Sequence, residues 1–409
     1  MTIYASTLLT LLSDRGYIHQ ATDAAALDAL AAREIVTGYI GFDATAPSLH
    51  VGSLVQIMML RRLQQAGHRP IVLMGGGTTK VGDPSGKDES RQMLSDEKIR
   101  KNIQGIRRVF KRFLTFDYSE TSPLFINNSR WLDRLRYIPF LREVGPHFTL
   151  NRMLTFDSVK LRLEREQPLT FLEFNYMILQ AYDFLELSRK AECRLQMGGS
   201  DQWGNIVNGI ELARRIDRTE LFGITTPLIT TADGAKMGKT AKGAVWLNKE
   251  LTSAYEYWQF WRNTADADVA KFLKLFTDLP LELIDQLGKL AGAEINEAKK
   301  ILATQATALL HGKKAALKAA FTAHQTFERR RAGDDLPTYK AEGQSISIVD
   351  ALVQVGFCSS RGEARRKISE NAVRVNEMLI EDPGEIIPLG KHGFKISLGK
   401  KKYGLIVPA

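Results

Sequence analysis

The chain has 409 residues, of which 44% are hydrophobic and 25% charged, a composition typical of globular proteins and unlike that of disordered, collagen-like or membrane-bundle chains. Its length predicts several domains rather than one. The net charge of +10 fits a polyanionic partner such as nucleic acid, although basic enzymes without such a partner are common.

The chain opens with a short apolar run, Thr7–Leu12, which is closed by the charged residues Asp14 and Arg15. We expect an amphipathic helix here rather than a secretory signal, and no other run approaches the roughly 20 apolar residues of a membrane span. The expected location is therefore cytoplasmic. Cys193 and Cys358 lie far apart without histidines at ligand spacing, so we expect neither a disulfide framework nor a zinc site.

Up to about residue 230, short β-branched or aromatic runs alternate with helical patterns, which is the order of an α/β fold. The runs predicted to be strands are residues 36–42, 70–74, 124–126 and 193–197. A helical pattern over residues 54–65, ended by Gly67, joins the first two strands into a βαβ unit, and another helix begins near Asp201. We therefore predict a Rossmann-like parallel sheet in a first domain, residues 1–245, with a helical insertion around 130–170.

Three further segments complete the expected organisation. Residues 246–332 are predicted to form an all-helical domain, because almost everything from Thr252 to Arg331 has a helical pattern. Residues 333–344 contain two glycines, two adjacent aspartates and a proline, which is typical of a linker. Residues 345–409 carry ten Lys/Arg against seven Asp/Glu and are predicted to form a small basic α+β module.

The first chemical motif is Pro47–Ser53 (Pro-Ser-Leu-His-Val-Gly-Ser), which lies between the first strand and its following helix. Ligands of α/β sheets bind at the carboxyl ends of strands, and a helix N-terminus there offers free N–H groups for phosphate. Gly52 permits close backbone approach, and His50 can donate a hydrogen bond to a phosphate oxygen. A histidine at a helix start is also a common cap, so this motif needs a partner.

The partner is the loop Lys236–Thr240 (Lys-Met-Gly-Lys-Thr), whose lysines and threonine can follow a pyrophosphate as charge builds on it. Alone, such a loop is more often simply solvated. Together, the His-x-Gly element after the first strand and the Lys-x-Gly-Lys-Thr loop after the last resemble the paired signatures of class I aminoacyl-tRNA synthetases. The sequence contains neither a Walker motif nor a Gly-x-Gly-x-x-Gly that opens the first helix, so kinase, GTPase and dehydrogenase functions lose support.

Three more strings accompany these motifs, at residues 39–45, 175–183 and 198–204. Within the helical second string, Tyr176, Gln180 and Asp183 are four and three residues apart and therefore share one helix face. A tyrosine, an amide and a carboxylate aimed together suit a substrate that carries an ammonium group and a phenol hydroxyl. The same spacing also fits residues that merely cover an amphipathic helix.

These strings, together with Val81–Lys87, closely resemble bacterial tyrosyl-tRNA synthetases, and the resemblance covers nearly the whole chain. It implies a tyrosine site made of Tyr39 and Asp183 for the phenol hydroxyl, Tyr176, Gln180 and Asp83 for the ammonium group, and Asp43 and Gln202 near the α-phosphate of ATP.

The same resemblance implies an ATP site. The residues that act on the phosphates are His50, Thr45, Lys87, Arg91, Lys236, Lys239 and Thr240, and the further ATP contacts are Gly41, Asp43, Gly52, Ser53, Gly199 and Asp201. Ser53 departs from the family, whose signature usually ends in histidine, so we expect altered rather than abolished ATP binding. Gly238 and Thr240 replace serines of the general loop signature, as is usual in the tyrosyl branch.

The implied reaction has two steps. The tyrosine carboxylate attacks the α-phosphate of ATP in line, giving tyrosyl-adenylate and pyrophosphate, and the terminal ribose hydroxyl of tRNA then attacks the activated carbonyl. Magnesium should accompany ATP, but no carboxylate cluster in the sequence indicates a protein-bound metal site. A homodimer is a family expectation, supported by the mix of apolar and basic residues between Trp131 and Phe174.

The C-terminal module supplies the RNA clue. Helical patterns are predicted over residues 345–353 and 359–368, and Ala372–Asn376 enters a hairpin. This order resembles the αL-type RNA-binding module shared with a small-subunit ribosomal protein. The residues expected to contact an RNA backbone are Arg361, Arg365, Arg366 and Lys367, together with the run Lys400–Lys402. A solvated basic helix is the alternative.

Three rival functions stay open at this point. A non-catalytic synthetase-like RNA-binding factor would be expected to lose Lys239, Asp183 or His50, and all three are present. A tryptophanyl-tRNA synthetase would lack the pair Tyr39 and Asp183 and normally the C-terminal module. A ligase for a small acid, such as pantothenate synthetase, shares the nucleotide elements but needs no RNA module.

Overall fold

A computed structural model describes residues 3–84, 93–230, 237, 239–240, 243–332, 337–376, 378–390, 393–399 and 402–409, with backbone alone for residues 157–158, 239–240 and 326–332. The chain divides into two compact units, Met1–Ala319 and Ala320–Ala409. No helix among the described residues is long and apolar enough to cross a membrane. Both cysteines are buried free thiols.

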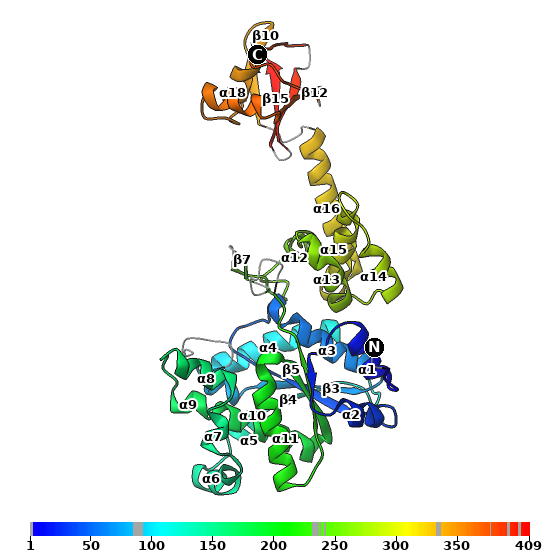
Figure 1. The fold of residues 1–409 in the computed structure, drawn as a ribbon, viewed down its shortest axis with the longest axis vertical. Helices are drawn as coiled ribbons and strands as arrows, with labels where there is room; N and C mark the ends of the chain where they lie inside the picture. Colours follow the sequence, from blue (N-terminus) through cyan, green and yellow to red (C-terminus); the bar gives the residue numbers. More distant parts are fainter. Residues whose placement is uncertain are drawn as a thin grey trace. The chain divides into compact units, whose positions relative to one another are not determined.

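A six-stranded sheet forms the centre of the first unit (Figure 1). Its strands are β1 Gln20–Ala21, β2 Thr37–Asp43, β3 Arg69–Gly75, β4 Leu124–Asn127, β5 Cys193–Gly199 and β6 Phe222–Thr226. They lie in the order β1-β6-β5-β2-β3-β4, and all neighbours are parallel except β1, which pairs antiparallel with β6. The predicted Rossmann-like sheet is confirmed, and the four predicted strands correspond to β2 through β5.

The strand order reverses beside β2. From β2 the chain proceeds outward through β3 to β4, and it then returns to the other side of β2 to form β5 and β6. In an open parallel sheet, such a reversal leaves a crevice between the carboxyl ends of the two strands at which it occurs. The crevice of this sheet therefore lies between the ends of β2 and β5.

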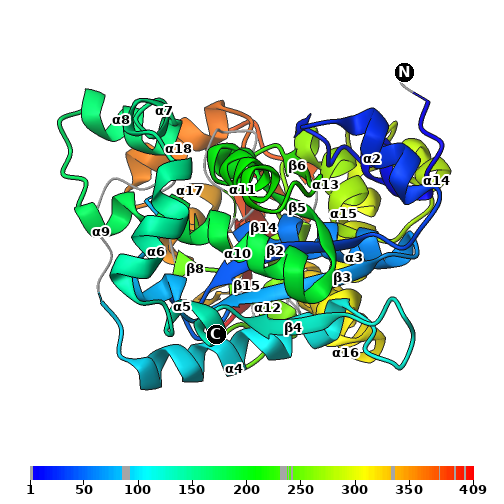
Figure 2. The same cartoon turned by 90° about the horizontal axis from the view of Figure 1, so that it is seen from below.

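Helices cover both faces of the sheet. α3 Leu54–Gln65 and α4 Asp96–Phe113 lie on one face, and α10 Tyr176–Ala191 and α11 Trp203–Ile216 lie side by side on the other (Figures 1 and 2). Side chains along β2 point alternately to the two faces of the sheet. The Tyr39 ring therefore packs on Phe184 of α10, with 5.2 Å between ring centroids, and the Phe42 ring packs on Phe110 of α4, with 4.9 Å between centroids. α3 coincides with the predicted crossover helix.

Between β4 and α10 the chain forms short helices, α5 Ser129–Leu132, α6 Tyr137–Val144, α7 Leu150–Met153, α8 Asp157–Glu164 and α9 Phe171–Phe174. This part of the chain leaves many large apolar side chains exposed, among them Tyr137, Ile138, Leu141, Leu150, Leu161, Leu163 and Phe171. So many large apolar side chains exposed within one stretch of the chain are typical of an interface with another macromolecule.

The region predicted to be helical forms α12 Ala254–Arg262, α13 Val269–Phe276, α14 Leu281–Leu287, α15 Ile295–His311 and α16 Lys313–Ala332. Up to Ala319 these helices belong to the same compact unit as the sheet. Arg62 of α3 pairs with Asp278 at 2.6 Å and donates to the carbonyl of Thr277, while Arg15, which follows helix α1 (Thr7–Asp14), donates to the same carbonyl at 3.0 Å. Buried guanidinium groups thus fasten the chain after α13 to α1 and α3.

The N-terminal amphipathic helix is confirmed as α1, which is followed by α2 Ala24–Ala31.

The second unit has a sheet ordered β12-β11-β14-β15-β9, whose strands are β9 Thr338–Ala341, β11 Val373–Val375, β12 Met378–Leu379, β14 Phe394–Leu398 and β15 Lys402–Pro408. A separate pair consists of β10 Ser345–Ser347 and β13 Ile386–Pro388, and the helices are α17 Ile348–Gln354 and α18 Arg361–Ser369. The predicted hairpin is confirmed by the antiparallel pair β11 and β12.

Two expectations for this unit need correction. The segment expected to be a linker contains β9, which pairs in parallel with β15 because its Ala341 and Tyr339 pack on the core of the unit. The helix expected from Ser345 begins only at Ile348, since the preceding three residues pair with β13 and the Ser347 side chain caps α17 by accepting from the Asp350 N–H.

Candidate active site

A cavity of about 490 Å³ opens at the crevice between β2 and β5. It brings together every tyrosine- or ATP-site residue from the sequence analysis whose side chain the structure describes. Those residues are Tyr39, Gly41, Asp43, Thr45, His50, Gly52, Ser53, Asp83, Tyr176, Gln180, Asp183, Gly199, Asp201 and Gln202. Three strings far apart in the sequence therefore share one cavity, as their positions at strand ends and on one helix face predict.

Asp183 is a buried carboxyl in this cavity. Its two oxygens accept hydrogen bonds from Asn128 Nδ2 at 2.8 Å and from Trp131 Nε1 at 2.7 Å. Burial raises the pKa of Asp183 to about 7; these two donors oppose the rise and the charge of Asp43 adds to it. The carboxyl therefore changes its protonation state near neutral pH while its orientation stays fixed by two N–H donors.

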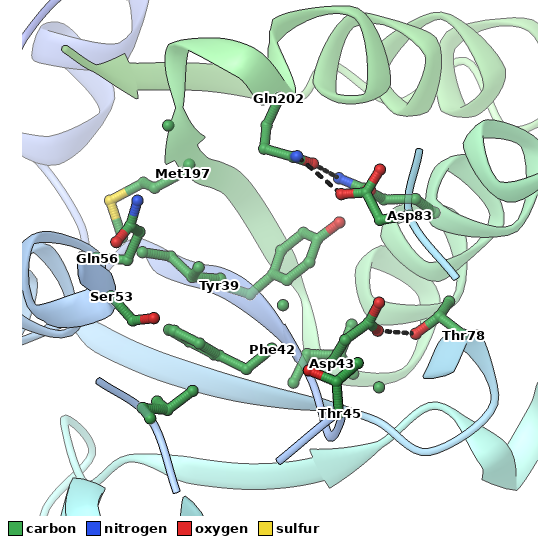
Figure 3. Close-up of a pocket in the computed structure, with 18 of the residues that line it drawn as sticks. Tyr39, Phe42, Asp43, Thr45, Ser53, Gln56, Thr78, Asp83, Met197 and Gln202 are labelled. Atoms are coloured by element: carbon green, nitrogen blue, oxygen red, sulfur yellow. Dashed lines mark hydrogen bonds between the residues drawn. The ribbon is translucent and has the colours of Figure 1, made fainter. Parts of the chain in front are cut away.

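Tyr39 lies within β2 and faces Asp183 of α10. Its hydroxyl is buried and has no hydrogen-bond partner among the described residues. Burial first, and the charge of Asp183 second, raise the pKa of the Tyr39 phenol well above its ordinary value, so the hydroxyl keeps its proton. Figure 3 shows the Tyr39 ring inside the pocket with its hydroxyl pointing away from Ser53 and Gln56. A buried, unpartnered hydroxyl costs free energy unless a ligand completes its hydrogen bonds.

A second polar cluster joins α10 to the start of α11. Gln202 Nε2 donates to Asp83 Oδ2 at 3.0 Å (Figure 3). Gln202 Oε1 accepts from Gln180 Nε2 at 3.3 Å. Asn205 donates to both glutamines, at 3.0 and 3.2 Å. The cluster presents one carboxylate and several amide oxygens, which suit a cationic ammonium group.

Asp43, at the end of β2, is held from two sides. Thr78 Oγ1 donates to one carboxylate oxygen at 2.7 Å and the Tyr176 hydroxyl to the other at 3.2 Å. Thr78 Oγ1 in turn accepts from Asn128 Nδ2 at 3.0 Å. A continuous chain of hydrogen bonds therefore links Asp43 to Asp183 through Thr78 and Asn128.

His50 precedes the 3₁₀ turn η1 Val51–Ser53. Its Nδ1 accepts from the Gly52 N–H at 2.9 Å, which assigns the ring proton to Nε2 and leaves that nitrogen as the donor. A Cβ on Gly52 would lie 2.6 Å from the His50 ring and 2.8 Å from the Met237 carbonyl. Glycine is thus needed for contact with both, and this contact joins the His-x-Gly motif to the Lys-Met-Gly-Lys-Thr loop.

Some assigned residues lie outside what the structure describes. Lys87, Arg91 and Lys236 fall in the undescribed segments, and Lys239 and Thr240 are described by their backbone alone, in the short strand β7 Lys239–Thr240. This strand pairs with β8 Gly243–Ala244. Trp246, two residues after β8, forms a β-bridge with His50.

Several functional-site residues were missed by the sequence analysis: Thr78, Asn128, Trp131, Gln56, Gln196 and Trp246. Asn128 directly follows β4 and Thr78 lies three residues after the end of β3, so the rule that ligand groups lie at the carboxyl ends of parallel strands would have marked both. Gln56 and Gln196 each bury a side-chain oxygen without a partner among the described residues, and no local sequence signal marks them.

In the second unit, four of the cations expected to contact RNA lie on α18, whereas Lys400 and Lys401 lie outside the described residues. Arg365 and Arg366 are exposed, and neither forms an ion pair among the described residues. Arg361 pairs with Asp350 at 2.8 Å, and Lys367 pairs with Glu370 at 2.6 Å. Such exposed pairs contribute little to stability and can open when a phosphate competes.

Comparison with known proteins decides the family. Residues 32–328 match the family model of class I tRNA synthetases for tryptophan and tyrosine, and residues 327–406 match the model of the tyrosine–tRNA ligase C-terminal domain. The chain is 62% identical to the tyrosine–tRNA ligase of Novosphingobium aromaticivorans and 63% identical to that of Zymomonas mobilis subsp. mobilis, in each case over 406 residues and 99% of both chains. The chain belongs to the tyrosyl-tRNA synthetases.

It is an enzyme with tyrosine–tRNA ligase activity, whose substrates are tyrosine, ATP and tRNA. The first family model leaves tryptophan and tyrosine open, and the C-terminal model together with the full-length relatives decides for tyrosine. A C-terminally truncated mitochondrial tyrosyl-tRNA synthetase of Aspergillus nidulans matches with a TM-score of 0.71 at 29% identity, covering 78% of this chain and 94% of that one. The Archaeoglobus fulgidus tyrosyl-tRNA synthetase, at 17% identity and a TM-score of 0.55 over 76% of this chain and 99% of that one, shares the fold alone.

Proposed function

We propose that the cavity between β2 and β5 binds tyrosine with its phenol at Asp183 and its ammonium group at Tyr176, Gln180 and Asp83. Gln202, which donates to Asp83, is proposed to orient the amino acid near the α-phosphate of ATP. The observation that carries this proposal is the unpartnered Tyr39 hydroxyl beside a carboxyl whose orientation two N–H donors fix. A phenol placed there donates to Asp183 and accepts from Tyr39, which satisfies both groups.

The tyrosine carboxylate then extends toward the end of β2, where Asp43 and Tyr176 lie. One of its oxygens attacks the α-phosphorus of ATP, the bond from that phosphorus to the bridging oxygen of pyrophosphate breaks, and tyrosyl-adenylate forms. Nothing in this step requires a protein nucleophile, so the rate derives from positioning and from groups that meet negative charge on the phosphates.

His50 serves as such a group through its Nε2–H, together with the Thr45 side chain, which lines the same cavity. Lys87, Arg91, Lys236, Lys239 and Thr240 are proposed to close on the pyrophosphate, a role carried over from the family motif. Among the described residues no group of three or more His, Cys, Asp or Glu side chains is placed to hold a metal. Magnesium enters the proposal as an ion carried by the ATP phosphates, which it would help to neutralise.

The second step, attack of the tRNA ribose hydroxyl on the activated carbonyl, requires an RNA surface as well as the cavity. We propose that α18 of the second unit contributes it through Arg365 and Arg366, joined by Arg361 and Lys367 once their ion pairs open. We also propose a homodimer formed through the exposed apolar side chains between β4 and α10, and a cytoplasmic location, where tRNA and ATP are available.

ATP–pyrophosphate exchange measured with each of the twenty amino acids tests the cavity directly. Tyrosine should support exchange far better than phenylalanine or tryptophan. Equal exchange with tyrosine and phenylalanine would contradict the proposed phenol site. Sedimentation of the wild-type chain and of a Leu141→Glu variant tests the dimer, which the variant should weaken.

A further inference from the structure

Helix α4 Asp96–Phe113 is strongly basic. Its 18 residues contain seven Lys/Arg against two acids, a balance of +5 in a chain whose net charge is +10. The seven are Lys98, Arg100, Lys101, Arg107, Arg108, Lys111 and Arg112. One helix therefore accounts for half of the formal charge of the protein.

Six of these cations form two rows along the exposed side of the helix, which we term the α4 face: Arg100, Arg107 and Lys111 in one row, and Lys101, Arg108 and Arg112 in the other. Each row follows the spacing i, i+7, i+11, which keeps side chains on one side of an α-helix over about 17 Å. The opposite side is buried and apolar, with Ile99, Ile106, Val109, Phe110 and Phe113.

The α4 face lacks compensating charge. None of its six cations forms an ion pair within the part of the chain that the structure describes, and Asp96 of the same helix is paired with Lys80 at 3.1 Å. Favourable interaction with the helix dipole accounts for cations in the last turn, such as Lys111 and Arg112, but not for Arg100 and Lys101 in the N-terminal half.

The helix is held rigidly against the active-site loop. Asn102 Nδ2 donates to the carbonyl of Ala44 at 2.7 Å, and Asn248 Nδ2 donates to the carbonyl of Gly105 at 3.2 Å. Gly105 contacts the Pro47 carbonyl so closely that any Cβ there would clash, at 1.9 Å. The cations of the α4 face are thus presented on a fixed scaffold, which lowers the entropic cost of docking a charged partner.

We propose that the α4 face is a second RNA-binding surface, located in the catalytic unit, which contacts backbone phosphates of the tRNA substrate. The inference extends the ligase activity, because it names the surface that meets the tRNA body, and it is independent of the residue roles proposed for the cavity. Arginine guanidinium groups, four of the six, suit phosphate oxygens because they donate in pairs. At the edge of the surface, Arg107 lies 4.7 Å above the Phe125 ring, on which the exposed Phe116 stacks at 4.9 Å.

The test compares two triple variants of the full-length protein that lose the same charge. The test variant is Arg100→Gln, Arg107→Gln and Lys111→Gln. The control variant is Arg33→Gln, Lys271→Gln and Lys289→Gln, three exposed cations of the first unit outside α4. The Kd for the tRNA substrate is measured between 50 and 200 mM KCl.

We expect the test variant to bind tRNA at least about tenfold more weakly at 100 mM salt. The slope of log Kd against log salt should fall by about two, since each lost phosphate contact removes roughly 0.7–0.9 from it. The control variant should stay within about twofold of the wild type. Tyrosine-dependent pyrophosphate exchange should be unchanged in both, because α4 contributes no side chain to the cavity.

Equal weakening by the two variants would overturn the proposal, since it would show a general charge effect. Unchanged tRNA affinity in the test variant would overturn it as well. If that variant instead loses binding to phosphatidylserine vesicles, the α4 face binds anionic lipid and not RNA. If pyrophosphate exchange falls in the test variant, two single variants are measured instead: Arg107→Gln, and Arg107→Lys, which keeps the charge. The proposal requires that Arg107→Gln binds tRNA more weakly and that Arg107→Lys binds tRNA nearly as well as the wild type. The tyrosine site is tested separately, by pyrophosphate exchange of the wild type with different amino acids. Equal exchange with tyrosine and phenylalanine would contradict the proposed tyrosine site but would not change the interpretation of the tRNA affinities.

Discussion

Replacing Asp183 by alanine tests the proposed phenol site most directly. The carboxyl is buried and accepts two N–H bonds, so its removal deletes a charged acceptor for the substrate and also leaves the Trp131 N–H and one N–H of Asn128 Nδ2 without an acceptor. Tyrosyl-tRNA synthetases are a known instance of the rule that a site built to bond a hydroxyl rejects the analogue that lacks it, and the rule is applied here rather than derived.

The magnitude follows from the type of bond. A hydrogen bond to a charged group is worth about 1.5–3 kcal/mol, so tyrosine activation should fall relative to phenylalanine activation by on the order of 10- to 160-fold. Tyr39→Phe should reduce the same ratio less, because the bond between two neutral hydroxyls is worth only about 0.5–1.5 kcal/mol. Asp183→Asn, which keeps the volume and one acceptor, should fall between them.

The assay is kcat/KM for pyrophosphate exchange with each of the two amino acids, measured for the wild type and the three variants. Thermal unfolding of each variant separates loss of specificity from loss of the fold, because the two unpaired donors in Asp183→Ala each cost about 1–3 kcal/mol of stability. If Asp183→Ala lowers activation of both amino acids by the same factor, the carboxyl is structural and the proposed phenol site is refuted.

The pKa of about 7 for Asp183 predicts that kcat/KM for tyrosine rises as pH increases from 6 to 8, because the ionised carboxylate is the stronger acceptor for the phenol. The rise should be absent with phenylalanine and in Asp183→Asn. A pH profile that is identical for both amino acids would contradict this prediction. Because this pKa lies above the unfolded value of 3.8, the neutral carboxyl contributes stability that is complete below about pH 4 and lost as pH rises through about 7, which pH-dependent urea unfolding of the wild type and Asp183→Asn can measure. Lys239→Ala and His50→Ala should each slow adenylate formation strongly with little change in tyrosine affinity, and single-turnover kinetics that show equal losses of both would indicate a folding defect instead. A chain ending at Ala332, which removes β9 together with the rest of the C-terminal sheet, should keep pyrophosphate exchange but lose most tRNA charging; normal charging would exclude an RNA-binding role for the second unit.

The sequence by itself determined the elements and motifs that depend on local spacing. Short β-branched or aromatic runs marked β2 through β5, a helical pattern marked α3, and the four- and three-residue spacing on α10 placed Tyr176, Gln180 and Asp183 on one face. These features need only neighbours a few residues away, since backbone geometry fixes where such side chains point.

Only the tertiary structure decided how those side chains are held. Asn128 donates to Asp183 across 55 residues of sequence. Burial of Asp183 in the folded chain, rather than its residue type, raises its pKa to about 7. The contact of Gly52 with the Met237 carbonyl and the pairing of β9 with β15 likewise join distant segments. Hydrogen bonds and desolvation of this kind depend on which segments the fold places side by side, and no local pattern in a single sequence records that.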